Sequence, residues 1–259
     1  PSAKDGNVSV TKFTINKCIG NNGSPKLIPA KNAEINDAKK ILSSVYGVKV
    51  VGITGSFGKT STKYILSRIL SEKYNVLHTP ESFNTPMGVV RTIREKMKAD
   101  TEIFVCEMGA KNVGDIKEIC DIVHPDFGLI TSVGAQHLET FKSLDNVFST
   151  KFELYDAVKA KGGFVLANGD NKIITDKADK DVILYSSDDK TSFYAKNINA
   201  GRSGASFDIV LGDETISVTT KLLGKHNVVN ILGAIAVSHT LGIPLNEMTV
   251  AVATLTPVP

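Results

Sequence analysis

Short apolar runs alternate with longer amphipathic stretches over most of this chain. Five runs are short, mostly apolar and bounded by turn residues, which is typical of buried strands. They are residues 49–54, 75–77, 102–106, 127–131 and 163–167. The stretches between them have helical apolar spacing, around residues 64–69, 87–97, 113–123 and 144–158. This alternation predicts an α/β fold, a mostly parallel sheet with helices on both faces.

The pattern changes between about residues 180 and 222. Segments 182–185, 206–210 and 216–220 have the character of short strands joined by turns, which predicts a small antiparallel patch. Helical spacing returns at residues 227–241 and 245–255, and the two helices are separated by a Gly-Ile-Pro turn.

The first 48 residues are less regular than the rest. Residues 8–15 alternate in the manner of a strand, and residues 20–25 form a cluster of turn residues. From about Asn32 the apolar spacing indicates a helix that leads into the next strand. We therefore expect an N-terminal segment, residues 1–48, of unassigned role, followed by one domain over residues 49–259.

Composition narrows the class of protein. Of the 259 residues, 42% are hydrophobic and 22% are charged, which is ordinary for a chain that buries its own core. The net charge of +3 comes with scattered lysines, so we expect no nucleic-acid partner. No apolar run approaches the ~20 residues of a membrane span. Cys18, Cys106 and Cys120 lack CxxC spacing, which favours reduced thiols and a cytoplasmic location.

One turn between a predicted strand and a predicted helix carries a phosphate-binding pattern. It has the form TGxxGKT, shorter than GxxxxGK[ST] because Ile53 stands where the longer form has its first glycine. Lys59 would provide a cation for the β- and γ-phosphates, and the Thr60 hydroxyl a ligand for Mg²⁺. A chance glycine turn before Lys-Thr is the alternative, but the strand before it and the helix after it favour a nucleotide site. The residues expected to bind the nucleotide are Gly55, Ser56, Gly58, Lys59, Thr60 and Ser61.

Two further polar residues follow predicted strands at the same edge of the sheet. Glu107 ends an apolar strand, where a carboxylate must be solvated, paired or bound to a cation. His137 follows the next strand along the chain. Solvation of Glu107 and a purely structural His137 both stay open, because Mg²⁺ usually prefers oxygen ligands to histidine.

Three other segments each have two interpretations. Asn84 or Thr85 could cap the helix that begins at the following proline. Lys151 lies in a predicted helix, where a solvated lysine paired with nearby acids is the ordinary interpretation. The segment Gly-Lys-His-Asn-Val-Val-Asn, residues 224–230, opens a helix that Asn227 could cap. Amide side chains such as Asn227 also suit adenine, because they both donate and accept hydrogen bonds.

Together with the phosphate loop, these segments resemble the Mur ligase family over about residues 49–259. The Glu-Met-Gly-Ala sequence at residues 107–110 and the His-Leu-Glu sequence at residues 137–139 are most similar to its branch that adds D-alanyl-D-alanine. The loop at residues 84–88 departs from that branch. The resemblance implies the central ATP-binding domain of a ligase of peptidoglycan precursor synthesis.

The resemblance also implies a role for each matching residue. Asn84, His226, Asn227 and Asn230 would contact ATP, the latter two at its adenine end. Two Mg²⁺ ions would be held by Thr60, Glu107, His137 and a carbamylated Lys151, and the catalytic residues would be Lys59, His137 and Lys151.

In that family a carboxylate attacks the γ-phosphate of ATP, and an amine then attacks the acyl phosphate. The implied partners are a UDP-sugar peptide, an amino substrate and a C-terminal domain of the same enzyme. The chain stops where that domain would begin, so we expect it to bind nucleotide but to ligate poorly alone. The alternatives are another Mur-type ligase (folyl- or cyanophycin-like), a precursor-amidating subunit, a P-loop kinase, or a nucleotide-binding module without ligase activity.

Overall fold

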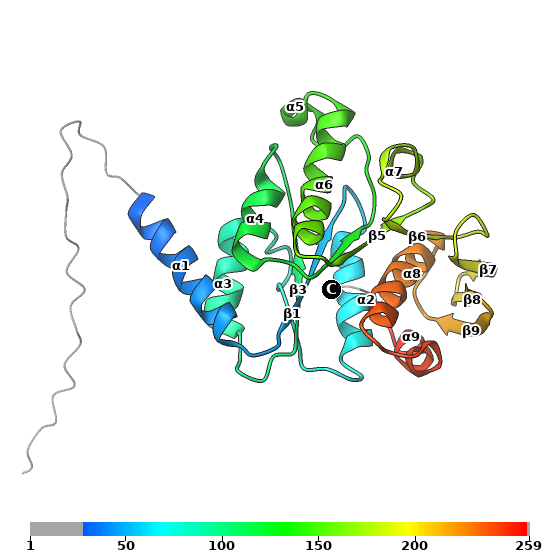
Figure 1. Ribbon diagram of the computed structural model, residues 1–259. Helices are drawn as coiled ribbons and strands as arrows, with labels where there is room; N and C mark the ends of the chain where they lie inside the picture. The colour runs from blue at the N-terminus through cyan, green and yellow to red at the C-terminus, as the bar shows by residue number, and fades with distance from the viewer. Residues whose placement is uncertain (1–27, 258–259) are drawn as a thin grey trace, which may run out of the picture.

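A nine-stranded sheet runs through residues 28–257, the part of the chain that the computed structural model describes (Figure 1). The strand order is β2-β3-β1-β4-β5-β6-β7-β8-β9, parallel from β2 to β7 and antiparallel from β7 to β9. The strands are β1 (Lys49–Thr54), β2 (Val76–His78), β3 (Ile103–Glu107), β4 (Phe127–Ile130), β5 (Phe164–Asn168), β6 (Ile183–Ser186), β7 (Phe193–Gly201), β8 (Gly204–Leu211) and β9 (Glu214–Thr220).

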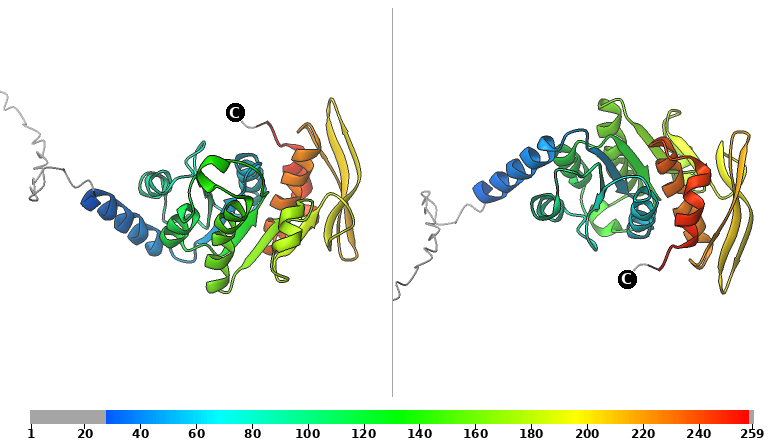
Figure 2. Two further views of the ribbon diagram at one scale, coloured as in Figure 1. Left: turned by 90° about the horizontal axis from the view of Figure 1, so that it is seen from above. Right: turned by 90° about the horizontal axis from the view of Figure 1, so that it is seen from below.

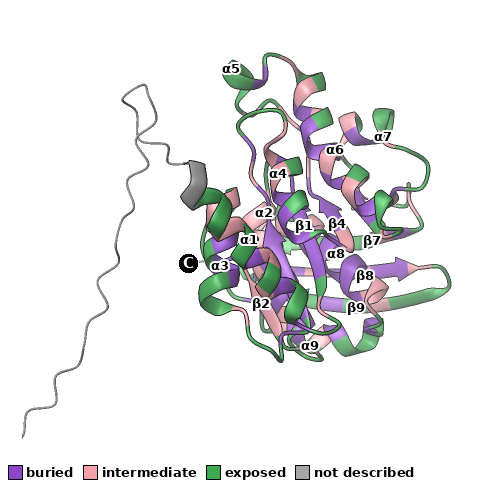
Figure 3. Cartoon of the chain, turned by 60° about the vertical axis from the view of Figure 1, so that its left-hand side comes forward, coloured by how far each residue is buried: buried purple, intermediate pink, exposed green. Residues whose placement is uncertain are grey.

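Helices cover both faces of this sheet and bury their apolar sides against it (Figure 3). One hydrophobic cluster joins the sheet to α2, α8 and α9, and a second joins it to α1, α3, α4 and α6. The helices are α1 (Ile28–Ser44), α2 (Lys59–Leu70), α3 (Pro86–Lys96), α4 (Asp115–Val123), α5 (Leu138–Phe141), α6 (Leu144–Ala160), α7 (Lys172–Lys177), α8 (Lys225–Thr240), the 3₁₀ turn η1 (Leu245–Met248) and α9 (Thr249–Ala253). Among residues 28–257, no helix is long and apolar enough to cross a membrane.

The strand order reverses at β1, which pairs with β3 on one side and β4 on the other. In register, Ile53 of β1 lies beside Glu107 of β3, and Thr54 lies beside Ile130 of β4. The loops that follow these three strands therefore meet at one edge of the sheet. In open α/β sheets this position, at the carboxyl ends of the strands where the order reverses, is where ligands bind.

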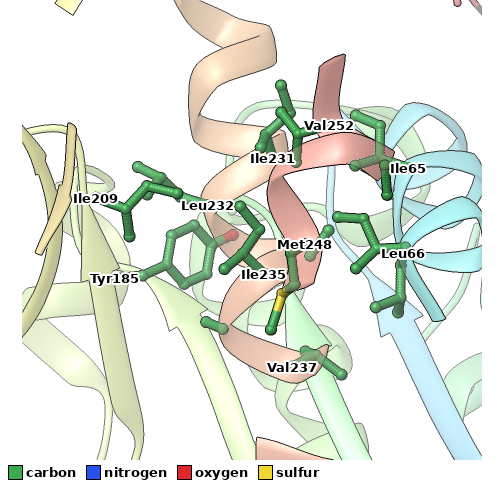
Figure 4. Close-up of a cluster of buried hydrophobic side chains, with 14 of the residues drawn as sticks. Ile65, Leu66, Tyr185, Ile209, Ile231, Leu232, Ile235, Val237, Met248 and Val252 are labelled. Carbon is green, nitrogen blue, oxygen red and sulfur yellow. The ribbon is translucent and has the colours of Figure 1, made fainter. Parts of the chain in front are cut away.

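Helix α8 fills the space between α2 and the antiparallel strands (Figure 4). Residues 230–238 of this helix are buried on all sides and mostly apolar, as expected for a helix inside a core. The ring of Tyr185 packs on its backbone at Gly233, where an added Cβ would lie 2.7 Å from Tyr185 Oη. Burial raises the pKa of Tyr185 well above its usual range.

Helix α1 and the antiparallel strands lie at opposite ends of the molecule (Figure 2). The predicted helix from about Asn32 is α1, and it packs on α3, where Arg94 donates to Asp37 at 2.8 Å. The strand and turn predicted at residues 8–15 and 20–25 lie outside the described residues.

The predicted α/β fold is confirmed, with corrections near the antiparallel patch. The assignment of residues 182–185 to that patch is wrong, because β6 pairs in parallel with β5. The patch also contains β7, which was not predicted from the sequence. The short helices α5 and α7, which lie elsewhere in the fold, were not predicted either. The single helix predicted at residues 245–255 is the 3₁₀ turn η1 followed by α9.

Candidate nucleotide and metal site

The phosphate loop requires glycine at two positions. Gly55 has φ +152° and Gly58 has φ +84°, both in the region that favours glycine. A Cβ on Gly55 would lie 2.1 Å from the Thr131 hydroxyl, so the loop after β4 fits directly against this glycine. The next residue of that loop, Ser132, accepts from the Ser56 N–H at 2.9 Å through its carbonyl. The loop after β4 thus holds the phosphate loop in shape.

Helix α2 begins at Lys59, so the free backbone N–H groups of its first turn lie at the phosphate loop. The Lys59 ammonium donates to the backbone carbonyl of Gly55, four residues earlier in the phosphate loop, at 2.7 Å. Burial lowers the pKa of Lys59, and the charge of Glu107 partly opposes this shift. An ammonium and a helix N-terminus in one place form a binding site for phosphate.

Glu107, at the end of β3, is fully buried and paired. Its Oε1 accepts from the Thr60 hydroxyl and from Asn84 Nδ2, each at 3.1 Å. Its Oε2 accepts from Lys63 Nζ at 2.9 Å. Simple solvation at a strand end, one of the two interpretations of this residue, is therefore wrong.

The oxygens of Thr60 and Glu107 fit a bound Mg²⁺. Their separation of 3.1 Å is close to the ~3 Å between neighbouring ligands of an octahedral ion with metal–oxygen distances of about 2.1 Å. Among residues 28–257 there is no group of three or more His, Cys, Asp and Glu side chains with metal-binding geometry.

The helix cap in the Asn84 segment is the neighbouring residue, Thr85. The Thr85 side chain caps α3 by accepting from the Gly88 N–H at 3.3 Å. Asn84 therefore reaches Glu107 with its amide, while its backbone carbonyl accepts from the Gly109 N–H at 2.7 Å. This arrangement places the Asn84 loop at the carboxyl end of β3.

A cavity of about 430 Å³ opens beside the phosphate loop on the α3, α4 and α6 side. Residues from five separate segments of the chain line it. Three of them are predicted site residues with a basic side chain: Lys59, His137 and Lys151. Its lining residues include Lys59, Asn84, Gly109, Lys111, His137 and Lys151.

Lys151 lies in this cavity with only 3% of its surface exposed. Burial, and then the charge of Lys59, lower the pKa of Lys151 to about 8. Within the described part of the chain it forms no ion pair, and the nearby Glu153 accepts instead from the backbone N–H groups of Gly114 and Lys117. The interpretation of Lys151 as a solvated, paired lysine is therefore wrong.

His137 stands at the mouth of the same cavity. It is exposed, has φ +55° and directly precedes α5. It lines the cavity together with Lys151, whereas Glu107 lies buried behind the Thr60 hydroxyl and Asn84. The four predicted metal ligands thus divide into two pairs: Thr60 with Glu107, and His137 with Lys151.

A second cavity, of about 320 Å³, lies near the start of α2 and is lined by Ser61, His226 and Asn227. Asn227 is not a cap of α8, since its amide donates to the Leu223 carbonyl at 2.9 Å. Asn230 links this cavity to the phosphate loop: its amide donates to Asn227 Oδ1 at 3.4 Å, and its Oδ1 would be 2.7 Å from a Cβ on Gly58. The structure therefore places Asn230 at the phosphate loop and two of its predicted companions in this cavity.

Residues 53–238 match the family described as the Mur ligase middle domain. The chain belongs to the Mur ligase family. UDP-N-acetylmuramoyl-tripeptide–D-alanyl-D-alanine ligase of Bacillus subtilis is 30% identical over 197 residues, which cover 76% of this chain and 42% of that protein. Its counterpart in Escherichia coli is 31% identical over 219 residues, which cover 82% and 47%. The chain thus spans less than half the length of these relatives.

Solved structures of Mur ligases have the same fold. The MurF ligase of Thermotoga maritima in complex with ADP superposes with a TM-score of 0.81 at 26% identity, over 96% of this chain and 56% of that one. MurF from Acinetobacter baumannii has a TM-score of 0.81 at 24% identity, over 88% and 50%. The family and fold that the motifs led us to expect are confirmed.

The site of this Mur ligase domain also contains residues that the sequence analysis missed. Lys63 pairs with Glu107, and Thr131 and Ser132 hold the phosphate loop. Lys63 stands four residues after Lys59, so the two lysines lie on one face of the predicted helix. This spacing could have indicated that Lys63 also belongs to the site. Thr131 and Ser132 follow a strand at the ligand-binding edge, but their contacts join positions more than 70 residues apart.

Proposed function

We propose that this chain is the nucleotide-binding part of an ATP-dependent ligase that adds D-alanyl-D-alanine to a UDP-muramoyl-tripeptide. The observation that carries this proposal is the Thr60–Glu107 oxygen pair beside Lys59 and its cavity. The names of the curated relatives support the substrate class, and the ADP bound to the Thermotoga maritima ligase supports the nucleotide.

The two cavities suggest how ATP would lie. The cavity of His226 and Asn227 would take the adenine, whose donor and acceptor edge suits the Asn227 amide. The phosphates would follow the loop to Lys59. The 430 Å³ cavity beyond Lys59 would then receive the γ-phosphate and the acceptor carboxylate.

Attack of a carboxylate on the γ-phosphate brings several negative charges together, so cations must stand where charge develops. Lys59 and the N-terminus of α2 would provide part of this positive charge. Thr60 and Glu107 would hold Mg²⁺, which adds positive charge at the phosphate oxygens when bound. ADP leaves in this step, and the resulting acyl phosphate would lie in the cavity. There an amine attacks its carbonyl carbon, loses a proton and displaces phosphate to form the amide.

Lys151 fits the proposed carbamate. Its amine, whose pKa is about 8, is partly unprotonated near neutral pH and can attack CO₂. The ammonium first loses one proton to become the amine, and a second proton leaves as the N–C bond to CO₂ forms, so a buried cation becomes an anionic group with two oxygens. Together with His137 this group would hold a second Mg²⁺ in the cavity.

The remaining partners follow from the same proposal. The UDP-sugar peptide, the amino substrate and a C-terminal domain of the same enzyme would complete the site, since the relatives are about twice as long as the matched region. We propose a cytoplasmic location, which the free, buried thiols of Cys106 and Cys120 support.

Calorimetric titration with Mg²⁺-ATP tests the nucleotide site. We expect binding by the unaltered chain and loss of binding in Lys59→Ala, because the phosphates lose their cation. Lys172→Ala is the matched control, since that side chain is 86% exposed on α7 and pairs only with Asp176. Equal binding by both variants would contradict the assignment of the phosphate loop.

The amino substrate requires a longer enzyme that includes this chain. With UDP-muramoyl-tripeptide and ATP, release of ADP should depend on D-alanyl-D-alanine and not on glutamate, the type of substrate that folyl-like ligases use. ADP release with glutamate alone would favour another Mur-type ligase.

A further inference from the structure

Lys63 is a buried cation to which the proposed chemistry gives no role. It lies on α2, one turn after Lys59, and its side chain is 0% exposed. Its ammonium donates to Glu107 Oε2 and to the backbone carbonyl of Glu81, and lies 4.8 Å from the centre of the Tyr64 ring. Burial of an ammonium is costly unless it is paired and hydrogen-bonded. These partners account for its stability in this place.

We propose that Lys63 is a positioning residue for the metal–nucleotide site. It holds one carboxylate oxygen of Glu107, so that only the other oxygen, Oε1, faces the metal. This inference deepens the proposed function and rests on the metal site described there.

The division of hydrogen bonds at Glu107 supports this role. Oε2 receives a charged bond at 2.9 Å, whereas both donors to Oε1 are neutral groups at 3.1 Å. All three bonds go to the ionised carboxylate, but only the one from Lys63 joins opposite charges, and it is also the shortest. A metal would therefore replace the bonds at Oε1 and leave the bond to Lys63 intact. Glu107 then binds the metal through one oxygen, in an orientation that is set before the metal arrives.

Lys63 also fixes the loop that leads to Asn84. Glu81 has φ +43°, a conformation that is uncommon for a residue other than glycine, and its carbonyl points to the Lys63 ammonium. Three residues later, Asn84 donates to Glu107 Oε1. The Lys63 ammonium thus fixes the Glu107 carboxylate and the loop of Glu81 and Asn84 relative to each other.

ADP affinity, measured by calorimetry with and without Mg²⁺, tests the role of Lys63. We expect Mg²⁺ to raise the ADP affinity of the unaltered chain. In Lys63→Met this increase should fall by about tenfold or more, as is typical when a group that orients a metal ligand is lost. The affinity for ADP without Mg²⁺ should fall much less, because only the loop that leads to Asn84 is affected in that case. Ser67→Ala, one turn further along α2, is the control because its buried hydroxyl has no partner.

The outcomes separate this inference from the proposed function. Equal losses with and without Mg²⁺ would mean that Lys63 is only structural, and no loss would also overturn the inference. If Mg²⁺ has no effect on ADP affinity in the unaltered chain, the proposed metal site itself is wrong and the inference falls with it.

A crystal structure of the unaltered chain with Mg²⁺ and ADP provides a test that does not depend on the folding of a variant. We expect Glu107 Oε1 about 2.1 Å from the metal and Oε2 still paired with Lys63. A carboxylate that binds the metal through both oxygens, or a Lys63 side chain turned away from it, would overturn the inference.

Discussion

Glu107 and Lys63 form an ion pair of 2.9 Å in which neither side chain is more than 1% exposed. The pair joins β3 to α2, two elements whose positions also define the phosphate site. A buried charge without its partner is strongly unfavourable, whereas the pair itself contributes little net stability. The same two charges are therefore expected to affect both folding and nucleotide binding.

The first prediction concerns the stability of this pair. Glu107→Gln leaves the Lys63 ammonium buried without a counter-charge, and we expect a loss of about 3–5 kcal/mol in the free energy of unfolding. Urea unfolding measures this loss. The double variant Lys63→Met/Glu107→Gln removes both charges and should recover most of it. The control is Glu72→Gln, which breaks an exposed pair with Arg68 and should cost less than about 1 kcal/mol. Similar losses for Glu107→Gln and Glu72→Gln would contradict the prediction.

The second prediction concerns the Lys151 amine. Because burial lowers its pKa to about 8, we expect it to form a carbamate with bicarbonate-derived CO₂ at pH 8. With ¹³C-labelled bicarbonate, a carbamate carbon resonance should appear for the unaltered chain and be absent in Lys151→Gln. Lys111→Gln is a matched control, since Lys111 lines the same cavity but is exposed. A resonance that survives in Lys151→Gln would assign the carbamate to another amine.

The third prediction is a pH dependence from His78. Burial, followed by the charges of Lys63 and Lys96, lowers the pKa of His78. The unfolded chain therefore takes up this proton more readily than the folded one. The contribution of His78 to the free energy of unfolding is fully present above its pKa in the unfolded chain, about 6.5. It is lost as the pH falls toward the lower pKa of the folded protein.

Urea unfolding at pH 7.5 and pH 5.5 measures this contribution. His78→Phe should lose less stability on acidification than the unaltered chain. His124→Asn, at an exposed position with φ +47°, should keep the original dependence. An unchanged pH dependence in His78→Phe would show that other groups are responsible.

The fourth prediction concerns the contact between α8 and β6. A Cβ at Gly233 would lie 2.7 Å from Tyr185 Oη and 2.8 Å from its Cζ. We expect Gly233→Ala to destabilise the fold by about 1–3 kcal/mol through overpacking, although alanine is the better helix former. Gly201→Ala is the control, since a Cβ there would meet no atom within 4 Å. Thermal unfolding of the two variants measures the difference, and equal melting temperatures would contradict it.

Local patterns predicted the strands β1 to β5 and the glycine turn that follows β1. The strand over residues 49–54 and the turn at Gly55 and Gly58 are encoded within a dozen residues, because apolar runs and glycine turns act locally. Local sequence patterns could not predict whether β6 pairs in parallel or antiparallel with its neighbour. Parallel or antiparallel pairing depends on how the connections cross the sheet, and the residues of a short apolar strand are similar in both cases.

The sequence pattern also could not predict the burial and hydrogen-bond partners of single polar residues. Lys151 has the sequence context of an exposed helical lysine, yet the packing of α6 buries it in a cavity with Lys59. Asn84 had two equal interpretations until the Thr85 cap left its amide free for Glu107.

The sequence by itself determined the strands β1 to β5 with the main helices between them, the glycine turn after β1 and the family of this protein, because these depend on short-range periodicity and on motifs of a few residues. The tertiary structure decided which charges are buried and which are paired. Lys63 and Glu107 are 44 residues apart, and their contact exists only because β1 brings the end of β3 beside the start of α2. A side chain's exposure to water, and with it the energy of its charge, is set by such distant neighbours.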